Sequence, residues 1–173
     1  MHLKYFRKET KETLRAGTID AEVLVQHLEF PIYAGPLPER TWRKPVVGPP
    51  NRPFAELQVV AALEEEGWSA AWVYRPSLFM SSWEPRQTAT FPAEACALHK
   101  RIGEVAGARS GSWDVFAWRE GAPLFVELKR AGSSDCVRES QLIWRRAALQ
   151  VGVPAAAFIV VEWSGGASPK TAR

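Results

Sequence analysis

The sequence predicts a mixed α/β domain in which a small central sheet is flanked by helices. The chain has 173 residues, enough for one compact domain. Its composition is 46% hydrophobic and 24% charged, which is typical of a globular chain rather than a disordered one. From residue 54 onward, helical patterns alternate with short runs that suit strands. The order is helix, strand, helix, strand, strand, helix, strand, or α-β-β-β-α-β when the inner helix is set aside.

The first 52 residues are interpreted as an N-terminal extension outside the core. Within it, Thr18 caps a short helix that runs through Leu28 and ends at Pro31. Residues 35–53 contain six prolines, a density that excludes long regular structure and favours a linker or wrapping arm. The domain is expected to cover residues 53–163, and residues 164–173 form a flexible tail.

Proline, glycine and capping residues mark the expected bounds of the helices and strands in the domain. A helix is expected over 54–66, between Pro53 and Gly67, and a second over 92–106, with Gly107 past its end. The apolar run 68–74 predicts a strand, and residues 76–92 are expected to be irregular. Runs at 113–118 and 124–129 flank a turn and predict a hairpin. A helix over 135–150, capped by Ser134 or Asp135, and a buried strand over 157–163 complete the order.

Polar residues interrupt the inward faces of these elements. Side chains alternate along a strand, so Glu127 and Lys129 share one face of 124–129 with Phe125. We expect residue 114 to pair with 127 or 129, which places Asp114 beside Glu127. A register shifted by one residue would turn Asp114 to the other face.

Helical spacing adds two further polar residues. Glu56 lies at one end of an apolar stripe on the 54–66 helix. Gln141 shares a face with Trp144 on the later helix, while Arg138, Arg145 and Arg146 fall toward the other side. Buried unpaired carboxylates are costly, so these groups are expected to bind one another, a metal or a ligand.

These residues resemble the metal site of the PD-(D/E)XK nuclease superfamily. The resemblance lies in Asp114, twelve intervening residues, and then Glu127-Leu128-Lys129. The helix with Glu56 before the first strand, and Arg138-Glu139-Ser140-Gln141 after the second acid, are similar to the VRR-NUC branch. The resemblance covers about residues 53–163 and implies a restriction-endonuclease-like core. Trp113 stands where the family usually has proline.

The resemblance implies a Mg²⁺-dependent hydrolase, with Mn²⁺ able to substitute. Mg²⁺ prefers oxygen ligands, typically one or two carboxylates plus waters. Asp114 and Glu127 are the expected direct ligands, and the family adds the backbone carbonyl of Leu128. Lys129 would orient or help deprotonate the attacking water. Glu56 would hold a metal-bound water or a second metal, and Gln141 would position Lys129 or a phosphate oxygen. Phosphate contacts are expected from Arg130, Arg138 and Arg145.

Simpler interpretations exist for each residue. Asp114, Glu127 and Lys129 could form a salt-bridged cluster on an exposed sheet face. Glu56 could complement the helix dipole, and Gln141 could lie on a solvated helix face. The Cys96-x-x-His99 spacing resembles a zinc motif but lacks a second pair, and Cys96 and Cys136 are expected to be buried free thiols. Tyr33, Trp42 and Trp83 suit either packing or stacking on bases.

The sequence therefore favours a DNA endonuclease that acts in repair, recombination or phage defence. No recognition helix or zinc finger is evident, which favours a DNA structure such as a junction, flap or end over a short sequence. The alternatives are a site-specific restriction-type enzyme and an inactive nucleic-acid-binding module on the same fold. The net charge of +3 permits a polyanionic partner. We expect a cytoplasmic protein with no membrane partner and no organic cofactor. A homodimer is a further possibility, with the segment 72–83 as a candidate interface.

Overall fold

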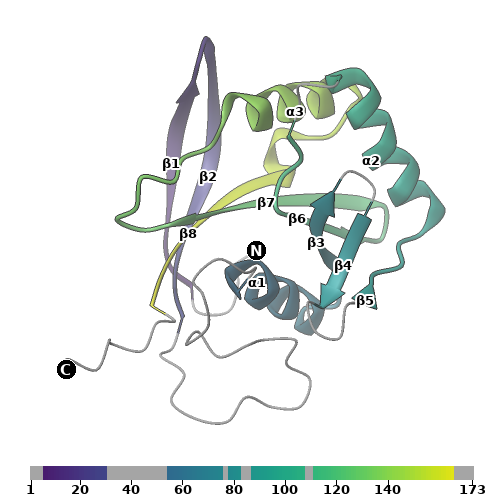
Figure 1. Ribbon diagram of the computed structural model, residues 1–173, viewed down its shortest axis with the longest axis horizontal. Helices are drawn as coiled ribbons and strands as arrows, with labels where there is room; N and C mark the ends of the chain where they lie inside the picture. The colour runs from purple at the N-terminus through teal and green to yellow at the C-terminus, as the bar shows by residue number, and fades with distance from the viewer. Residues whose placement is uncertain (1–5, 31–53, 76–77, 83–86, 108–110, 166–173) are drawn as a thin grey trace.

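The computed structural model describes residues 6–30, 54–75, 78–82, 87–107 and 111–165. Its strands form one mixed sheet in the order β1-β2-β8-β7-β6-β3-β4-β5 (Figure 1). Strand β8 runs parallel to both of its neighbours, β2 and β7, and the other pairs are antiparallel. The strands are β1 (Phe6–Ala16), β2 (Ile19–Phe30), β3 (Ser69–Arg75), β4 (Leu78–Ser82), β5 (Gln87–Thr88), β6 (Val115–Arg119), β7 (Ala122–Arg130) and β8 (Phe158–Gly165).

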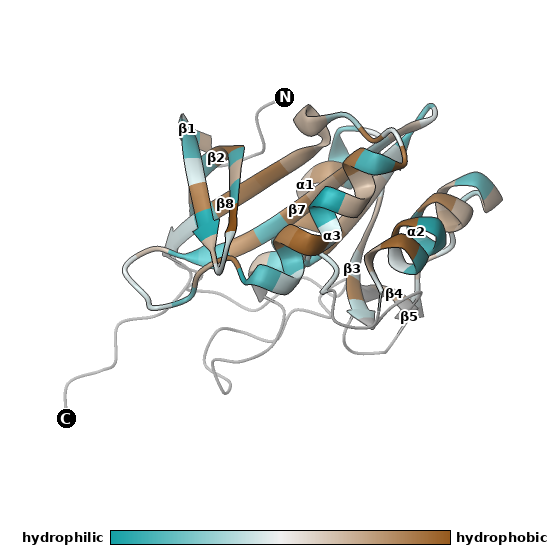
Figure 2. Ribbon diagram, turned by 90° about the horizontal axis from the view of Figure 1, so that it is seen from above, coloured by the Kyte–Doolittle hydropathy of each residue, from teal (hydrophilic) through white to brown (hydrophobic). Residues whose placement is uncertain are grey.

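The helices cover both faces of the sheet and make three layers. Helix α1 (Phe54–Glu65) packs on one face, while α2 (Ala93–Ala106) and α3 (Glu139–Gln150) pack on the other (Figure 1). Both α2 and α3 alternate between hydrophobic and hydrophilic segments, as expected for helices that cover a sheet (Figure 2). None of the described helices is long and apolar enough to cross a bilayer.

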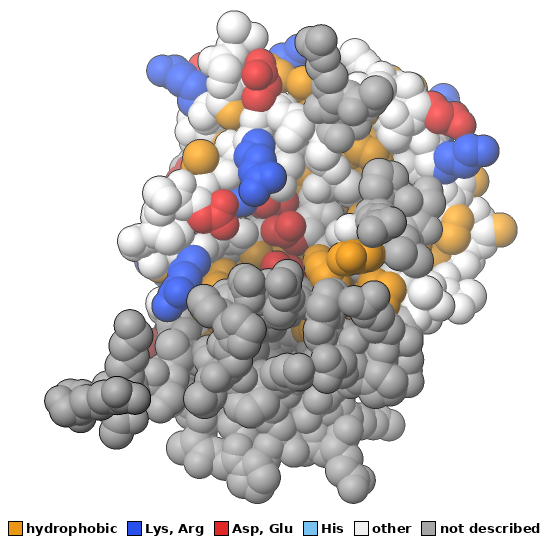
Figure 3. Space-filling view, in the orientation of Figure 1, with side chains coloured by type: hydrophobic (Ala, Val, Ile, Leu, Met, Phe, Trp, Pro, Cys, Tyr) orange, Lys and Arg blue, Asp and Glu red, His pale blue; other side chains and the backbone are white. Residues whose placement is uncertain are grey.

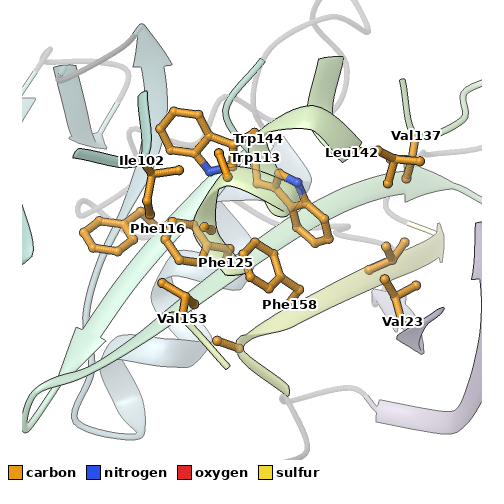
Figure 4. Packing of buried hydrophobic residues seen from close by; sticks show 14 of the residues in the cluster. Val23, Ile102, Trp113, Phe116, Phe125, Val137, Leu142, Trp144, Val153 and Phe158 are labelled. Carbon is orange, nitrogen blue, oxygen red and sulfur yellow. The ribbon is translucent and has the colours of Figure 1, made fainter. Parts of the chain in front are cut away.

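The core has one hydrophobic cluster on each face of the sheet. The cluster beneath α2 and α3 is rich in aromatic rings: Phe125 stacks on Phe158 with ring centroids 5.0 Å apart, and Phe116 is tilted against Phe125 at 5.2 Å (Figure 4). The cluster beneath α1 is mainly aliphatic and includes Val126 and Leu128. Residues of β7 therefore alternate between the two clusters, and this alternation fixes which of its side chains meet α3.

From residue 54 onward, most of the expected helices and strands are present in the mixed α/β structure. The helices at 54–66 and 92–106, the strand at 68–74, the hairpin and the final buried strand all occur within a residue or two of their expected bounds. The hairpin pairs Val115 with Val126, so the same register, continued by one residue, sets Asp114 opposite Glu127. That is the register on which the predicted site depends.

The prediction for the N-terminal segment was wrong for residues 6–30. The expected helix over 18–28 is strand β2, which pairs with β1 on one side and with β8 on the other. Its residues alternate between buried and exposed from Ile19 to Val25, a period of two that outweighs the capping residue Thr18. These residues therefore belong to the sheet rather than to an extension. The remainder of the predicted arm, residues 1–5 and 31–52, lies outside the described residues, as does the tail beyond 165.

Three smaller corrections concern loops and cysteines. The stretch 76–92, expected to be irregular, contributes β4 and β5. Helix α3 begins at Glu139 rather than at 135, because residues 135–138 are not helical. Cys96 and Cys136 are exposed rather than buried, whereas His99 is buried, so the two groups of the Cys96-x-x-His99 motif face different surroundings.

Candidate metal and catalytic site

The hairpin of β6 and β7 brings the two predicted ligands together. Asp114 directly precedes β6, and its Oδ2 accepts a hydrogen bond from the backbone N–H of Leu128 at 2.9 Å. Because Leu128 follows Glu127 on β7, this bond holds the Asp114 carboxylate next to Glu127. Asp114 is also held through its backbone, whose carbonyl accepts a hydrogen bond from Val73 N at 2.8 Å. Asp114 is thus hydrogen-bonded to β7 on one side and to β3 on the other.

All five residues predicted to be catalytic line one cavity of about 330 Å³. Glu56 enters it from the first turn of α1, and Gln141 enters it from the first turn of α3. Side chains from both helical layers therefore meet beside the N-terminal end of the central strand β6. The complete lining is Glu56, Gly111, Ser112, Asp114, Glu127, Leu128, Lys129, Asp135, Arg138, Ser140 and Gln141. Figure 3 shows acidic and basic side chains gathered near the middle of one face of the molecule.

Glu127 is the most deeply buried acid of the site, with 1% of its surface exposed. Its Oε1 lies 2.7 Å from Lys129 Nζ, but neither carboxylate oxygen has a well-aligned hydrogen bond among the described residues. Burial, together with repulsion from Asp114, raises the pKa of Glu127 to about 8, although Lys129 acts in the opposite direction. A buried acid in these surroundings either takes up a proton or pairs with a cation.

The other two predicted acids share this electrostatic strain. Burial raises the pKa of Asp114, even though the Leu128 N–H and the Lys129 ammonium favour its charged form. Burial and repulsion from Asp114 raise the pKa of Glu56 to about 7. Glu56 is therefore not a solvated residue that serves only the helix dipole, because its carboxylate interacts with the other acids of the cavity.

Lys129 is held between two carboxylates. Its Nζ lies 2.7 Å from Glu127 Oε1 and 3.2 Å from Asp135 Oδ1. Burial lowers the pKa of Lys129, but attraction to Glu127, and also to Asp114 and Asp135, outweighs burial and leaves that pKa above its ordinary value. In this arrangement Lys129 is an ammonium that donates hydrogen bonds into the cavity.

Asp135 is a fourth acid of the cavity, and sequence reasoning missed its role. It was expected to cap the helix over 135–150, but it lies in the loop before α3 and reaches back to Lys129. The sequence offers one signal, since Asp135 follows a Gly-Ser-Ser turn shortly after the end of β7. Polar residues in a loop after a strand can return to that strand's side chains, and this one does so.

Gln141 lies inside the site, as predicted from its helix face. It is buried, and its Oε1 accepts a hydrogen bond from the backbone N–H of Arg138 at 2.9 Å. This bond fixes the orientation of the amide. The amide also interacts with Glu127 and partly opposes the rise in the pKa of that acid. The alternative of a solvated position for Gln141 is contradicted by its burial.

The three arginines expected to contact phosphates differ in accessibility. Arg138 is exposed and lines the cavity, and Arg130 is exposed at the end of β7, with its guanidinium 5.5 Å from the Trp163 ring centroid. Arg145 is buried instead, and its Nη2 donates to the carbonyl of Glu22 at 2.8 Å. The expectation for Arg145 is therefore wrong, because this guanidinium joins α3 to β2. Tyr33, Trp42 and Trp83, the candidates for base stacking, lie outside the described residues.

The donor atoms of the cavity suit a hard cation. Glu56, Asp114, Glu127 and Asp135 all offer carboxylate oxygens. Leu128, which follows Glu127 and donates its backbone N–H to Asp114, also lines the cavity. Among the described residues, no three His, Cys, Asp or Glu side chains form a ready-made metal-binding cluster. Mg²⁺ needs no such cluster, because it commonly takes one or two carboxylates and completes its octahedron with water. The unsatisfied carboxylate of Glu127 and the adjacent Asp114 could provide those two ligands.

Comparison with known proteins returned no match, whether against family models, curated proteins or solved structures. The residues and their geometry therefore carry the functional argument.

Proposed function

We propose that the protein is a Mg²⁺-dependent endonuclease that hydrolyses phosphodiester bonds in DNA. The observation that carries this proposal is the cavity in which Asp114, Glu127 and Lys129 meet with Glu56 and Gln141. A salt-bridged surface cluster would leave its acids solvated, whereas burial here raises the pKa of Glu127 to about 8. The order α1-β3-β6-β7-α3-β8 also agrees with the α-β-β-β-α-β order of a restriction-endonuclease-like core, with β4, β5 and α2 as insertions.

Hydrolysis would form a bond between a water oxygen and phosphorus and break the bond from phosphorus to the leaving sugar oxygen; the attacking water would release a proton to solvent, and the leaving oxygen would take one up. Mg²⁺ bound by Asp114, Glu127 and the Leu128 carbonyl would neutralise phosphate charge and stabilise the leaving oxygen. Because the raised pKa of Lys129 keeps it protonated, its role would be to orient the attacking water and bind a phosphate oxygen rather than to remove a proton. Gln141 would align these groups, and Glu56 would hold a water on the α1 side.

Arg138 is exposed and lines this cavity, and Arg130 is exposed at the end of β7. Phosphate contacts of this kind give affinity without sequence choice. We therefore propose that the enzyme acts at DNA junctions, flaps or ends, in repair, recombination or phage defence, rather than at a short sequence.

The test is cleavage of plasmid, branched, flapped and single-stranded DNA with Mg²⁺, with Mn²⁺ and with EDTA. Lys129→Met should lose at least about a hundredfold in rate, the scale of a lost proton-handling or orienting group. Lys100→Met is the matched control, because Lys100 is an exposed lysine of α2 whose Nζ lies 3.7 Å from Glu104 Oε1. Metal-dependent cleavage that Lys129→Met abolishes and Lys100→Met retains would support the proposal.

Other outcomes would replace the proposal. DNA binding without cleavage under every metal condition would indicate the inactive binding module. A fixed set of fragments from plasmid DNA would indicate a site-specific restriction-type enzyme. Thermal unfolding of each variant keeps loss of fold apart from loss of chemistry.

A further inference from the structure

The short segment 111–113, which directly precedes Asp114, makes polar contacts with two helices, α2 and α3. Gly111 N donates to the carbonyl of Ser140 at 3.0 Å, in the first turn of α3. Ser112 Oγ lies 3.1 Å from Nε2 of the buried His99, on α2. Trp113 Nε1 donates to the carbonyl of Gln141 at 3.1 Å. Each residue of the segment thus makes its own polar contact with a helix of the α2–α3 layer.

Trp113 has the most restrictive position of the three. Its side chain is fully buried, and its ring packs edge-on against Phe158 of β8 with centroids 4.9 Å apart (Figure 4). The ring therefore cannot move without disturbing β8, and its N–H reaches the backbone of the helical turn that carries Gln141. The Trp113 side chain thereby links the residue that precedes Asp114 to the backbone of Gln141, and Asp114 and Gln141 line the same cavity.

Close approach between this segment and α3 has its own sequence requirement. A Cβ at position 111 would lie 2.9 Å from Ser140 Oγ, which is closer than real Cβ contacts allow. Glycine at this position lets the chain run against the first turn of α3. The contact at Gly111 and the hydrogen bond from Trp113 therefore both hold the 111–113 segment against the first turn of α3.

We propose that Trp113 is a positioning residue for the candidate site and sets the distance between Asp114 and Gln141. This inference rests on the proposed function. The nucleases that the sequence resembles usually have proline at this place, which shapes a turn; here a hydrogen-bond donor connects to the helix that bears the glutamine. Groups that orient the ligands of a metal site commonly change affinity or activity by about 10-fold to 100-fold when they are lost.

The experiment compares Trp113→Phe with Trp144→Phe. Both tryptophans are buried beside the same aromatic cluster, but Trp144 Nε1 has no hydrogen-bond partner among the described residues. Both substitutions remove similar volume, and only the first removes a hydrogen bond. Mn²⁺ affinity, measured from the electron paramagnetic resonance signal of free Mn²⁺, provides a readout that needs no turnover.

Trp113→Phe should weaken Mn²⁺ binding about tenfold and lower kcat by a similar factor, with KM for DNA within about twofold. Trp144→Phe should leave Mn²⁺ affinity within about twofold of the wild-type value. Equal weakening in both variants, or none in Trp113→Phe, would overturn the positioning role while leaving the proposed function intact. Absence of Mn²⁺ binding to the wild-type protein would overturn the proposed function itself.

Gly111→Ala provides a second variant in case Trp113→Phe does not fold. It leaves the aromatic core untouched, and its Cβ would lie 2.9 Å from Ser140 Oγ and 3.4 Å from Ser140 Cβ, so the segment or the Ser140 side chain must shift. It should weaken Mn²⁺ binding in the same direction, and wild-type affinity in this variant would contradict the requirement for close approach.

Discussion

The carboxylate of Asp114 accepts a hydrogen bond from the backbone N–H of Leu128, with 2.9 Å between Oδ2 and the nitrogen. This bond joins the residue just before β6 to the C-terminal part of β7 and holds Asp114 beside Glu127, the residue before Leu128. Two carboxylates that would repel each other in isolation are thereby held together by the backbone. The energetic cost appears in the raised pKa of both acids.

Asp114→Asn separates the charge of this residue from its structural role. The asparagine side chain keeps an oxygen that can accept the Leu128 N–H, so the fold should be retained, but it loses the anionic charge needed for a metal ligand. We expect DNA cleavage to fall at least about a hundredfold, with the thermal unfolding midpoint nearly unchanged. Asp20→Asn, which alters an exposed acid paired with Arg15, is the control and should cleave normally. Full activity in Asp114→Asn would exclude this residue as a ligand.

The free energy of unfolding should fall as pH rises, because Glu127 and Glu56 are buried acids with raised pKa values. Their pKa values rise from the ordinary 4.5 to about 8 and about 7 on folding. The folded state therefore binds more protons than the unfolded state between pH 4.5 and 8, so their contribution to stability is present at low pH and is lost as pH rises. In EDTA, the free energy of unfolding of the wild-type protein should decline over this interval more steeply than that of Glu127→Gln.

Added Mg²⁺ should offset this decline near pH 8, because a bound cation favours the charged carboxylates. Denaturant unfolding at several pH values, with and without Mg²⁺, measures both effects. Identical pH slopes in the wild-type protein and in Glu127→Gln would argue against a buried, strained carboxylate at this position.

Arg145 and Arg138 should respond in opposite ways to replacement by alanine. Arg145 is buried, donates to the Glu22 carbonyl, and lies with its guanidinium 5.5 Å from the Phe158 ring centroid. Arg145→Ala should therefore lower the free energy of unfolding by about 1.5–3 kcal/mol, the range for a hydrogen bond from a charged group. Arg138 is exposed, so Arg138→Ala should weaken DNA binding and reduce its salt dependence with little change in stability. Calorimetry and DNA titration at two salt concentrations distinguish the two arginines.

The N-terminal hairpin should be required for folding. Leu28 of β2 is 2% exposed and packs in the cluster beneath α1. Leu28→Ala should destabilise the protein by about 2–5 kcal/mol, the cost of removing a large aliphatic side chain from a core. Val105→Ala, at a half-exposed position of α2, should change stability by less than about 0.5 kcal/mol. A small loss in Leu28→Ala would restore the interpretation of this region as an appended arm.

The predictability of each part of the structure follows from the range of the interactions that form it. The hairpin of β6 and β7 was predictable because its alternation and its turn are local, and the face shared by Glu127 and Lys129 follows from that alternation. Strand β2 was missed because a cap at Thr18 suggested a helix, although its alternation and its pairing with β1 are local; only its pairing with β8, more than a hundred residues away, has no local signal. Long-range pairing is not visible in a local pattern.

The same distinction applies to the candidate site. Glu56, Asp114, Glu127, Lys129 and Gln141 could be chosen because each is a polar residue on an otherwise apolar face. Asp135 lies in an irregular loop, where no periodicity marks an inward side chain, and only its contact with Lys129 reveals it. Arg145 was assigned to the wrong side because its helix also contacts β2, which the sequence did not place in the sheet.

The most direct measurement is the anomalous diffraction of a crystal soaked in Mn²⁺. The proposed site predicts a peak in the cavity within about 2–2.5 Å of carboxylate oxygens of both Asp114 and Glu127, with Lys129 Nζ beside it but not bound to the ion. A peak that contacts neither acid, or an Asp114 carboxylate directed away from Glu127 in the soaked crystal, would contradict the metal site and with it the assignment as a nuclease.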